Sequence, residues 1–546
     1  MPALETDIAT EQAAFDAEVA SIEQAWKSPR QAHLKRPYSA RTIAGLRNSI
    51  PQTYVSSTMA DKLWGQLNEH RKHGTCELTY GATDPIQVSQ MVKHQQTIYV
   101  SGSLCGTSEV STPGRDAADY PWDTVPKVVD KIFRSQMWHD QRQRQQRFST
   151  PESKRGELEN WDYLAPIVAD ADMGFGGLTS TIKMTKAFVE AGVAMIHMDD
   201  LATGMKRFSM GMGRTTVPTS EYVSRLTAVR MQFDIMGPKL GSGAEPVLFI
   251  FAFWRYQVRE ADIYSATTML MCRCDTATCE FITSVIDPRD HPYILGATKD
   301  VPSLTSAISA ATTTPDYQWI RNTWKESAGL VTFDEAVKSN TSEEQYKVYT
   351  SKLAEKEVTP MSQRRQIAKE VLGKDVFWDW ELPRSLEGQY MWAPTIQTVI
   401  ERASAVAPLG DVTWARIDAP TLSSLTEFHS AMNALFPNRL FGFGYVAGYD
   451  FSKAGFSEEE IKHLHKILAK MGVVWQVQPV WVTGALSDVT EKFGKMWQEK
   501  GMGMWVREYQ RTGWLKGVDG AHKLEWSGGY LADGFAEAVS GRDMAL

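Results

Sequence analysis

The chain has 546 residues, of which 43% are hydrophobic and 23% are charged, a composition typical of globular proteins. Its formal net charge of -7 gives no electrostatic reason to bind nucleic acid or an anionic membrane. Its most apolar run, residues 247–254, is much shorter than the roughly 20 residues that span a bilayer.

Neither end of the sequence has a recognisable targeting signal. The N-terminus is acidic and has neither an apolar signal core nor an Arg-rich transit pattern, and the last residues are not Ser-Lys-Leu. We therefore expect a cytoplasmic protein.

Short apolar runs alternate with helical patterns along most of the chain, which indicates parallel βα units and a closed barrel. The strand candidates are LAPIVADAD, AMIHMDD, MLMCRCD, DVTWARI, RLFGFGY and WQVQPVW. After the first of these, Leu178, Ile182, Thr185 and Val189 recur at helical spacing. The fold class that we predict is α/β, a (β/α)₈ TIM-like barrel with N-terminal helices, an inserted helical segment and C-terminal helices.

The predicted boundaries follow from changes in composition. We expect an N-terminal helical region in 1–60, the first part of the barrel in 61–294, an inserted polar helical segment in 295–375, the second part of the barrel in 376–500 and C-terminal helices in 501–546.

Three early strand candidates end in charged side chains. Barrel enzymes have their catalytic residues at the carboxyl ends of the strands. These are Asp170 and Asp172, then Asp199 and Asp200, then Arg273 and Asp275. The third candidate also belongs to a cysteine cluster, Cys272, Cys274 and Cys279. A tetrahedral metal site needs a fourth nitrogen or sulfur ligand at a familiar spacing, and none follows, so we interpret these cysteines as buried strand residues.

Eight collinear blocks, from about residue 20 to about residue 540, resemble isocitrate lyase and 2-methylisocitrate lyase. The blocks are CELTYGATDPIQVSQM, YVSG, RDAADYPWDTVP, PIVADADMGFGGLT, VPTSEYVSRL, ITSVIDPRDHPYILG, FWDWELPRSLEGQY and EWSGGY. The resemblance implies a Mg²⁺-dependent barrel lyase that cleaves isocitrate to glyoxylate and succinate. It also implies a homotetramer whose subunits exchange C-terminal helices.

One half of the family's active site is present in the sequence. The resemblance implies Mg²⁺ (or Mn²⁺) bound directly or through water by Asp116, Asp170, Asp172 and Asp199, the last replacing a Glu. Hard oxygen ligands in an incomplete cage suit Mg²⁺, which keeps waters. The resemblance also implies Tyr99 and Arg273 as catalytic residues, with Ser101, Gly102 and Arg273 around glyoxylate.

The other half is altered. The family's Lys-Lys-Cys-Gly-His loop reads Lys206 to Met210 here, so Phe208 replaces the proton-donating Cys and Met210 replaces the His. Loss of one catalytic acid typically costs about 10²–10⁴-fold in rate. The family's Asn-x-Ser-x-Ser run, which holds succinate, is replaced here by Gly444, Val446 and Gly448. A Thr of the family is replaced by Pro479, a Glu by Arg416 and a Trp by Ser103.

These changes leave three functional hypotheses. The first is a Mg²⁺-dependent carbon–carbon lyase for a 2-oxo or 2-hydroxy carboxylic acid with a more apolar second-substrate pocket. The second is a pseudoenzyme that acts as a subunit or partner of an active homologue, for example in a hetero-oligomer. The third is a genuine isocitrate or 2-methylisocitrate lyase with an unrecognised acid. The partner that we expect is a small oxo or hydroxy acid, and we expect neither nucleic acid nor a membrane as a partner.

One segment does not fit the family pattern. Between Met236 and Cys272 lie 35 residues where the family has only a few, and they follow neither a helical nor a strand period. Our hypothesis is that part of this insert, near 242–265, is a translated, unspliced intron; the alternative is a loop at the barrel rim. A transcript that encodes the full segment after splicing would contradict it.

Overall fold

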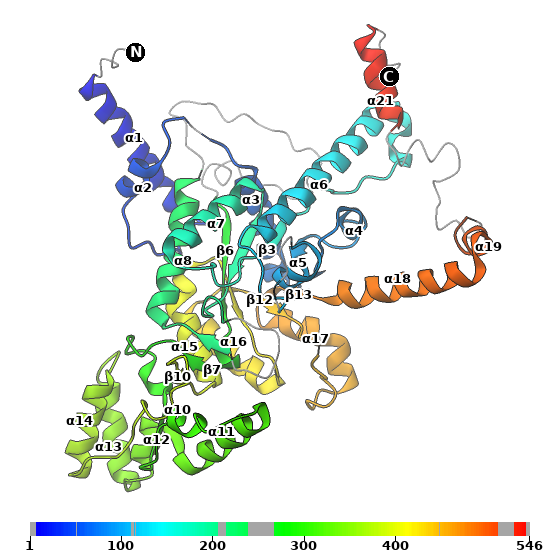
Figure 1. Ribbon diagram of the computed structural model, residues 1–546. Helices are drawn as coiled ribbons and strands as arrows, with labels where there is room; N and C mark the ends of the chain where they lie inside the picture. The colour runs from blue at the N-terminus through cyan, green and yellow to red at the C-terminus, as the bar shows by residue number, and fades with distance from the viewer. Residues whose placement is uncertain are drawn as a thin grey trace.

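The computed structural model describes residues 7–50, 52–110, 114, 116–205, 214–237, 267–446, 448–510 and 529–541. Its centre is a sheet of eight strands (Figure 1). The strands are β1 (Glu77–Tyr80), β2 (Ile98–Val100), β3 (Ile167–Asp170), β4 (Met195–Met198), β6 (Met269–Cys274), β11 (Val412–Ala415), β12 (Leu440–Gly444) and β13 (Val473–Gln478).

This sheet closes into a barrel. Its order is β1-β13-β12-β11-β6-β4-β3-β2, and every neighbouring pair is parallel. The two ends of that order meet at a parallel bridge between Gly81 and Tyr99, where the Ala82 N–H donates to the Tyr99 carbonyl at 2.8 Å. All six strand candidates of the sequence form barrel strands, so the predicted (β/α)₈ fold is confirmed.

Alternation along the strands separates an inner from an outer core. Met195 of β4 packs in the inner cluster with Trp414 and Trp475, whereas Ile196 and Met198 pack outward against the helices. Because successive side chains of a strand point to opposite faces, His197 and the following Asp199 share the inner face with Met195.

Helices surround the barrel on its outside (Figure 1). Before and between the strands lie α1 (Ile8–Trp26), α2 (Ala40–Leu46), α3 (Val55–His73), α4 (Pro85–Met91), α5 (Gly102–Ser108), α6 (Thr124–Ser149), α7 (Leu178–Glu190), α8 (Thr219–Ile235), α15 (Ile396–Val406), α16 (Leu422–Leu435) and α17 (Glu458–Lys470). Short helical turns are η1 (Glu152–Glu157), η2 (Thr276–Thr278), η3 (His291–Tyr293) and η4 (Ala407–Leu409).

Helix α7 lies where the sequence predicts a helix. Of the four residues that recur at helical spacing, Thr185 and Val189 are buried beside Met184 and Phe188, whereas Leu178 and Ile182 are exposed. The face that contacts the barrel is therefore displaced around the helix axis from the stripe that these four residues form.

Between β6 and β11 the chain leaves the barrel and forms a separate lobe (Figure 1). This lobe contains α10 (Leu304–Ile308), α11 (Thr314–Ala328), α12 (Phe333–Lys338), α13 (Glu343–Ala354) and α14 (Met361–Leu372). Two small sheets accompany it: β5 (Arg214–Thr216), β7 (Cys279–Ile282) and β10 (Tyr390–Met391) in one, and β8 (Leu295–Ala297) with β9 (Leu330–Thr332) in the other.

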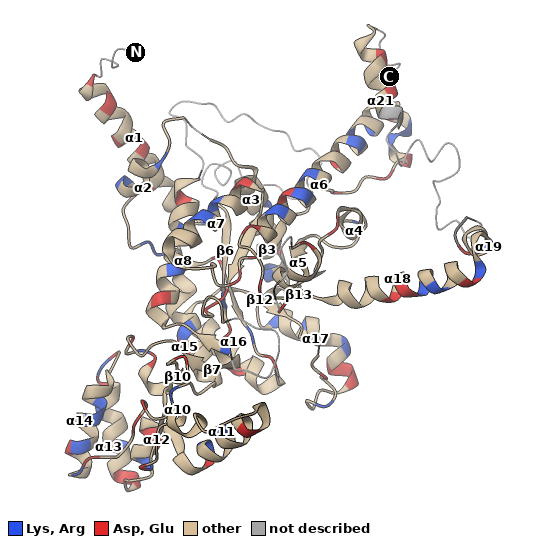
Figure 2. Cartoon of the chain, viewed as in Figure 1, with Lys and Arg blue, Asp and Glu red and all other residues tan. Residues whose placement is uncertain are grey.

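The C-terminal part projects from the barrel as α18 (Trp481–Lys500), α19 (Met502–Met504) and the π-helical turn η5 (Trp505–Gln510) (Figure 1). The last helix, α21 (Gly529–Val539), lies against α6. Lys, Arg, Asp and Glu are interspersed along α6 and α18 (Figure 2). Among the described helices, none combines the length and the hydropathy that a membrane crossing needs.

Candidate active site

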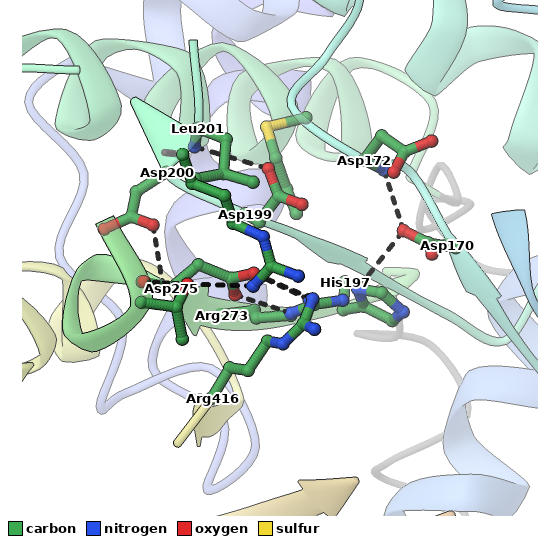
Figure 3. Close-up of polar contacts among 12 residues, drawn as sticks. Asp170, Asp172, His197, Asp199, Asp200, Leu201, Arg273, Asp275 and Arg416 are labelled. Atoms are coloured by element: carbon green, nitrogen blue, oxygen red, sulfur yellow. Dashed lines mark hydrogen bonds and ion pairs between the residues drawn. The ribbon is translucent and has the colours of Figure 1, made fainter. Parts of the chain in front are cut away.

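The charged residues expected at the strand ends gather at the carboxyl end of the barrel (Figure 3). Asp170 ends β3, Asp172 follows two residues later, and Asp199 follows β4. The three side chains are almost completely buried. Parallel strands that end at one rim therefore bring these three carboxylates into one cluster.

A tight turn positions Asp172. Its φ is 45°, an uncommon conformation for a residue with a side chain, and its N–H donates to Oδ1 of Asp170 at 2.9 Å. The carbonyl of Asp172 in turn accepts the N–H of Asp199 at 2.8 Å. The first hydrogen bond closes the turn after β3, and the second connects the ends of β3 and β4 through the backbone.

Gly102 makes room for two of the carboxylates. Its N–H points at Oδ2 of Asp170, 3.3 Å away. A Cβ added to Gly102 would overlap the hydroxyl oxygen of Tyr120 and lie 3.0 Å from Oδ2 of both Asp170 and Asp172. Since the Tyr120 hydroxyl donates to Asp172, only a glycine fits here without displacing that contact.

Arg273 is held by a carboxylate of its own strand end. Its Nε and Nη2 donate to the two oxygens of Asp275 at 2.7 and 2.8 Å, and its guanidinium lies 4.6 Å from the ring centre of Trp414. No described residue accepts a hydrogen bond from its Nη1. Asp275 therefore occupies the bidentate face of Arg273, and Nη1 remains as a donor for a ligand.

His197 and Tyr99 form a buried pair beside this cluster. The Tyr99 hydroxyl lies 2.9 Å from Nε2 of His197, and Nδ1 of His197 lies 3.6 Å from Oδ1 of Asp170. Burial lowers the pKa of His197 to about 4 and raises the pKa of Tyr99 well above its usual value. The imidazole is therefore neutral at pH 7 and accepts from Tyr99, which leaves its Nδ1 proton facing Asp170.

Burial and mutual repulsion disfavour the charged forms of two carboxylates in this cluster. Burial raises the pKa of Asp172 to about 7, and Arg273 opposes the rise. Burial and the neighbouring Asp275, Asp172 and Asp170 raise the pKa of Asp199 well above its ordinary value. A cation at this position would relieve the repulsion.

The donor set suits Mg²⁺ better than a metal that requires a full protein cage. Within the described parts of the chain, no three His, Cys, Asp or Glu side chains form a direct ligand set. Mg²⁺ is usually bound by one or two carboxylates and several waters, so Asp170, Asp172 and Asp199 fit it by a mixture of direct and water-mediated contacts.

Other expected residues lie around or apart from this cluster. Asp116 precedes α6, and its carboxylate accepts the N–H of Ala118 at 2.9 Å, a local contact. Ser101 follows β2, and its hydroxyl lies 3.0 Å from that of Ser103. Phe208 and Met210 lie outside the described residues, as does most of the proposed intron near 242–265.

The altered positions at and just after the ends of β12 and β13 carry no hydrogen-bonding side chains. A Cβ added to Gly444 would overlap Trp414. Val446 is half-buried, Gly448 is exposed with open space around it, and Pro479 follows the last residue of β13. Trp481, just beyond Pro479, packs its ring against Tyr80 with the ring centres 4.8 Å apart.

Arg416 enters the site from the end of β11. Its Nη1 lies 3.5 Å from Oδ2 of Asp275 (Figure 3). Its Nε donates to Asp418 at 2.6 Å. Asp418 also accepts from Arg214 at 3.1 Å. Together these side chains form an alternating series of guanidinium and carboxylate groups that begins at Arg273.

The sequence did not single out three residues of this site: His197, Tyr120 and Trp414. His197 could have been identified from the sequence, because it lies two residues before Asp199 on a predicted barrel strand and so faces the same way. No sequence pattern indicates Tyr120 or Trp414 as site residues, since their contacts with Asp172 and Arg273 join segments that are distant in the sequence. Cys272 and Cys274 of β6 and Cys279 of β7 are all buried.

A family model described as the isocitrate lyase family matches residues 18–244 and 255–545. The chain is 48% identical to the mitochondrial 2-methylisocitrate lyase of Schizosaccharomyces pombe over 99% of both proteins. It is 34% identical to the isocitrate lyase of Oryza sativa subsp. japonica, over 98% of this chain and 92% of that protein. It is 31% identical to the 2-methylisocitrate lyase of Hypocrea atroviridis, over 97% and 92% respectively.

These relatives correct one expectation. The proteins from S. pombe and H. atroviridis are both named as mitochondrial, so the cytoplasmic location expected from the sequence is wrong. That expectation depended on the composition of the first residues, and a weakly basic or acidic start does not exclude import. The unmatched residues 245–254 fall inside the insert between Met236 and Cys272.

Proposed function

The chain belongs to the isocitrate lyase family, and we propose that it is a Mg²⁺-dependent carbon–carbon lyase for a 2-oxo or 2-hydroxy carboxylic acid other than isocitrate. The observation that supports this most is the buried cluster of Asp170, Asp172 and Asp199 facing Arg273. Three buried carboxylates beside a guanidinium suit a metal ion and the carboxylate of a ligand together.

We assign the two halves of the site to two parts of the substrate. The 2-oxo carboxylate head lies between the three carboxylates and Arg273, where Nη1 of Arg273 donates to its carboxylate. The Tyr99 hydroxyl, oriented by His197, and the Ser101 side chain and Gly102 backbone lie at the edge of this head pocket. Mg²⁺, when bound, polarises the oxygen on C2 and stabilises the negative charge that develops there.

The rest of the substrate, which we call the tail, lies towards β12 and β13. Gly444, Val446, Gly448 and Pro479 offer no side-chain donors to it. A second carboxylate there would lose water without gaining partners, whereas apolar area gains about 25 cal/mol per Å² on burial. We therefore propose a tail that is more apolar and less acidic than succinate.

Loss of the loop acid supports the same conclusion. Phe208 has no proton to donate, and neither has Met210, so the carbanion that isocitrate cleavage would leave on succinate has no donor from this loop. Efficient isocitrate cleavage is not expected.

A second candidate, 2-methylisocitrate lyase activity, is favoured by the S. pombe relative, which bears that name and is 48% identical. A third is a pseudoenzyme that serves as a subunit of an active homologue. Incubation of the protein and MgCl₂ with isocitrate and with 2-methylisocitrate, followed by assay of the released oxo acid, separates these. We expect neither substrate to be cleaved. Rapid pyruvate release from 2-methylisocitrate would select the second candidate, and failure of every 2-oxo acid to bind would select the third.

We further propose a homotetramer, as the family resemblance implies. Supporting it, α18 leaves the barrel with Leu486, Val489 and Trp497 exposed, and α21 exposes Phe535 and Val539 (Figure 1). Apolar side chains on a projecting helix are usually covered by another subunit.

A further inference from the structure

Glycines on β12 leave the inner face of this strand without side chains. Phe443 packs outward against the helices, so Gly442 and Gly444 on either side of it face the barrel interior. A Cβ on Gly442 would lie 3.0 Å from Cε of Met271, and a Cβ on Gly444 would overlap Cζ2 of Trp414. Large side chains from β6 and β11 therefore fill the space that β12 leaves open.

The indole of Trp414 reaches from the head pocket to this open face of β12. Trp414 lies beside Arg273 in the ladder between β11 and β6, and the guanidinium carbon of Arg273 lies 4.6 Å from its ring centre. The far end of the ring, Cζ2 and Cη2, lies over Gly444. The ring of His197 packs edge-on against it with the ring centres 5.1 Å apart. A buried ring with these neighbours is a fixed wall, because a close-packed interior resists the displacement of a large side chain.

A ligand that extends from Arg273 towards β12 runs along the edge of this ring. The edge offers apolar contact to the tail of such a ligand. It also limits the width of the tail, because a side group on the tail would have to displace a ring that packs on Arg273 at one end and on Gly444 at the other. Overpacking of this kind is unfavourable.

We propose that Trp414 determines the specificity of the tail pocket, the space between its indole and the ends of β12 and β13. The site then accepts a 2-oxo or 2-hydroxy acid with an unbranched apolar tail and excludes one with a branched tail. The inference rests on the proposed function, which places the head at Arg273 and the tail towards β12. Gly444 belongs to the same element, since a side chain there would occupy the volume of the indole.

Two probes test this by titration calorimetry of the full-length protein in MgCl₂. The acids 2-oxopentanoate and 4-methyl-2-oxopentanoate have the same head and the same chain length, and they differ by one methyl group on the tail. A close-fitting apolar pocket discriminates one such group by about 10- to 200-fold. We expect the natural protein to bind 2-oxopentanoate at least about tenfold more tightly than its branched counterpart.

Two variants separate the tail from the head. Trp414→Phe keeps a ring face beside Arg273 but shortens the ring that reaches Gly444, so the affinity ratio of the two acids should fall to less than about threefold. Its affinity for pyruvate, which has only a methyl group as a tail, should change by less than about threefold. Trp414→Leu removes the ring face as well and should weaken the binding of pyruvate too.

The matched control is Trp378→Phe in the inserted lobe. Trp378 is also buried, lies 5.5 Å from the guanidinium carbon of Arg365, and fills the space that a Cβ on Gly296 would need. The same exchange therefore opens a similar space away from the barrel mouth. It should leave the affinity ratio of the two acids as it is in the natural protein.

Equal affinity of the natural protein for the two acids would overturn the inference without any variant, and this measurement decides even if Trp414→Phe does not fold. An unchanged ratio in folded Trp414→Phe, or an equal narrowing in Trp378→Phe, would also overturn it. If pyruvate and both tailed acids fail to bind in the presence of Mg²⁺, the proposed function itself fails. If they bind without discrimination, only the role of Trp414 fails.

Discussion

A Cβ placed on Gly444 would overlap Cζ2 of Trp414 and lie 3.0 Å from its Cη2 atom, so the indole occupies the space into which a side chain at position 444 would extend. Trp414 is itself fixed, because its ring lies against the guanidinium of Arg273 and 5.1 Å from the ring of His197. The head pocket and the altered tail pocket therefore share one wall.

Gly444→Ala should destabilise the folded protein by about 1–3 kcal/mol, the usual cost of overpacking a core. The matched control is Gly448→Ala on the following loop, where an added Cβ meets open space and the change should stay within about 0.5 kcal/mol. Chemical denaturation of the two variants measures both values. Equal stability of the two would show that Trp414 moves aside without cost.

Mg²⁺ should stabilise the protein more as the pH rises. Burial raises the pKa of Asp172 from 3.8 to about 7, so between these values the folded state holds a proton that the unfolded chain releases. This contribution to stability is present at low pH and is lost as the pH rises through about 7. A bound cation must displace that proton below pH 7 and need not do so above it.

The rise in Tm on adding MgCl₂ should accordingly be larger at about pH 8 than at about pH 6, with NaCl of equal ionic strength as the reference. Asp172→Asn should remove the Mg²⁺ effect, whereas Asp488→Asn on the exposed surface of α18 should keep it. A Mg²⁺ effect that is independent of pH, or that survives Asp172→Asn, would argue against this cluster as the metal site.

Arg273→Lys should lower the affinity for pyruvate in MgCl₂ by more than about tenfold, because a single ammonium cannot bind Asp275 and a ligand carboxylate in the same planar geometry. The control is Arg289→Lys. Arg289 binds Asp287, also two residues away, through Nε and Nη2 but outside the barrel mouth. Calorimetry should show unchanged pyruvate affinity for that control, and a loss equal to that of Arg273→Lys would indicate a general effect on folding.

Phe208→Cys should not restore isocitrate cleavage, since the tail pocket would still lack the donors missing at Gly444, Val446, Gly448 and Pro479. A coupled assay of glyoxylate release, with the natural protein as the blank, measures this. Turnover near the ordinary enzyme median of about 10 s⁻¹ would show that the loop acid alone had been limiting.

The sequence predicted the barrel well because alternation and strand-end charges are local patterns. It placed Asp170, Asp172 and Asp199 at strand ends, and parallel strands bring such ends together. The spacing predicted the helix α7 but not which of its residues are buried: Leu178 and Ile182 are exposed, because the contact face depends on how the helix packs on the barrel.

Contacts between distant segments could not be predicted in this way. The pairing of Arg273 with Asp275, two residues apart at the end of β6, is local, but the sequence analysis assigned Arg273 to a ligand and did not predict it. The approach of Arg416 to Asp275 depends on the register of two strands separated by the inserted lobe. Both contacts change which hydrogen-bond donors remain for a ligand. The sequence therefore predicted which residue types form the site, but not which of their donors are left for a ligand.

Calorimetric titration of pyruvate with and without Mg²⁺ tests most directly whether the head half of the site is functional. Binding that requires Mg²⁺ and is abolished by Asp172→Asn is the result we expect, because the metal and the carboxylate of the ligand share one buried cluster. Binding that is unaffected by Mg²⁺, or no binding of pyruvate, glyoxylate or 2-oxopentanoate at millimolar concentration, would contradict a retained 2-oxo acid site in this chain.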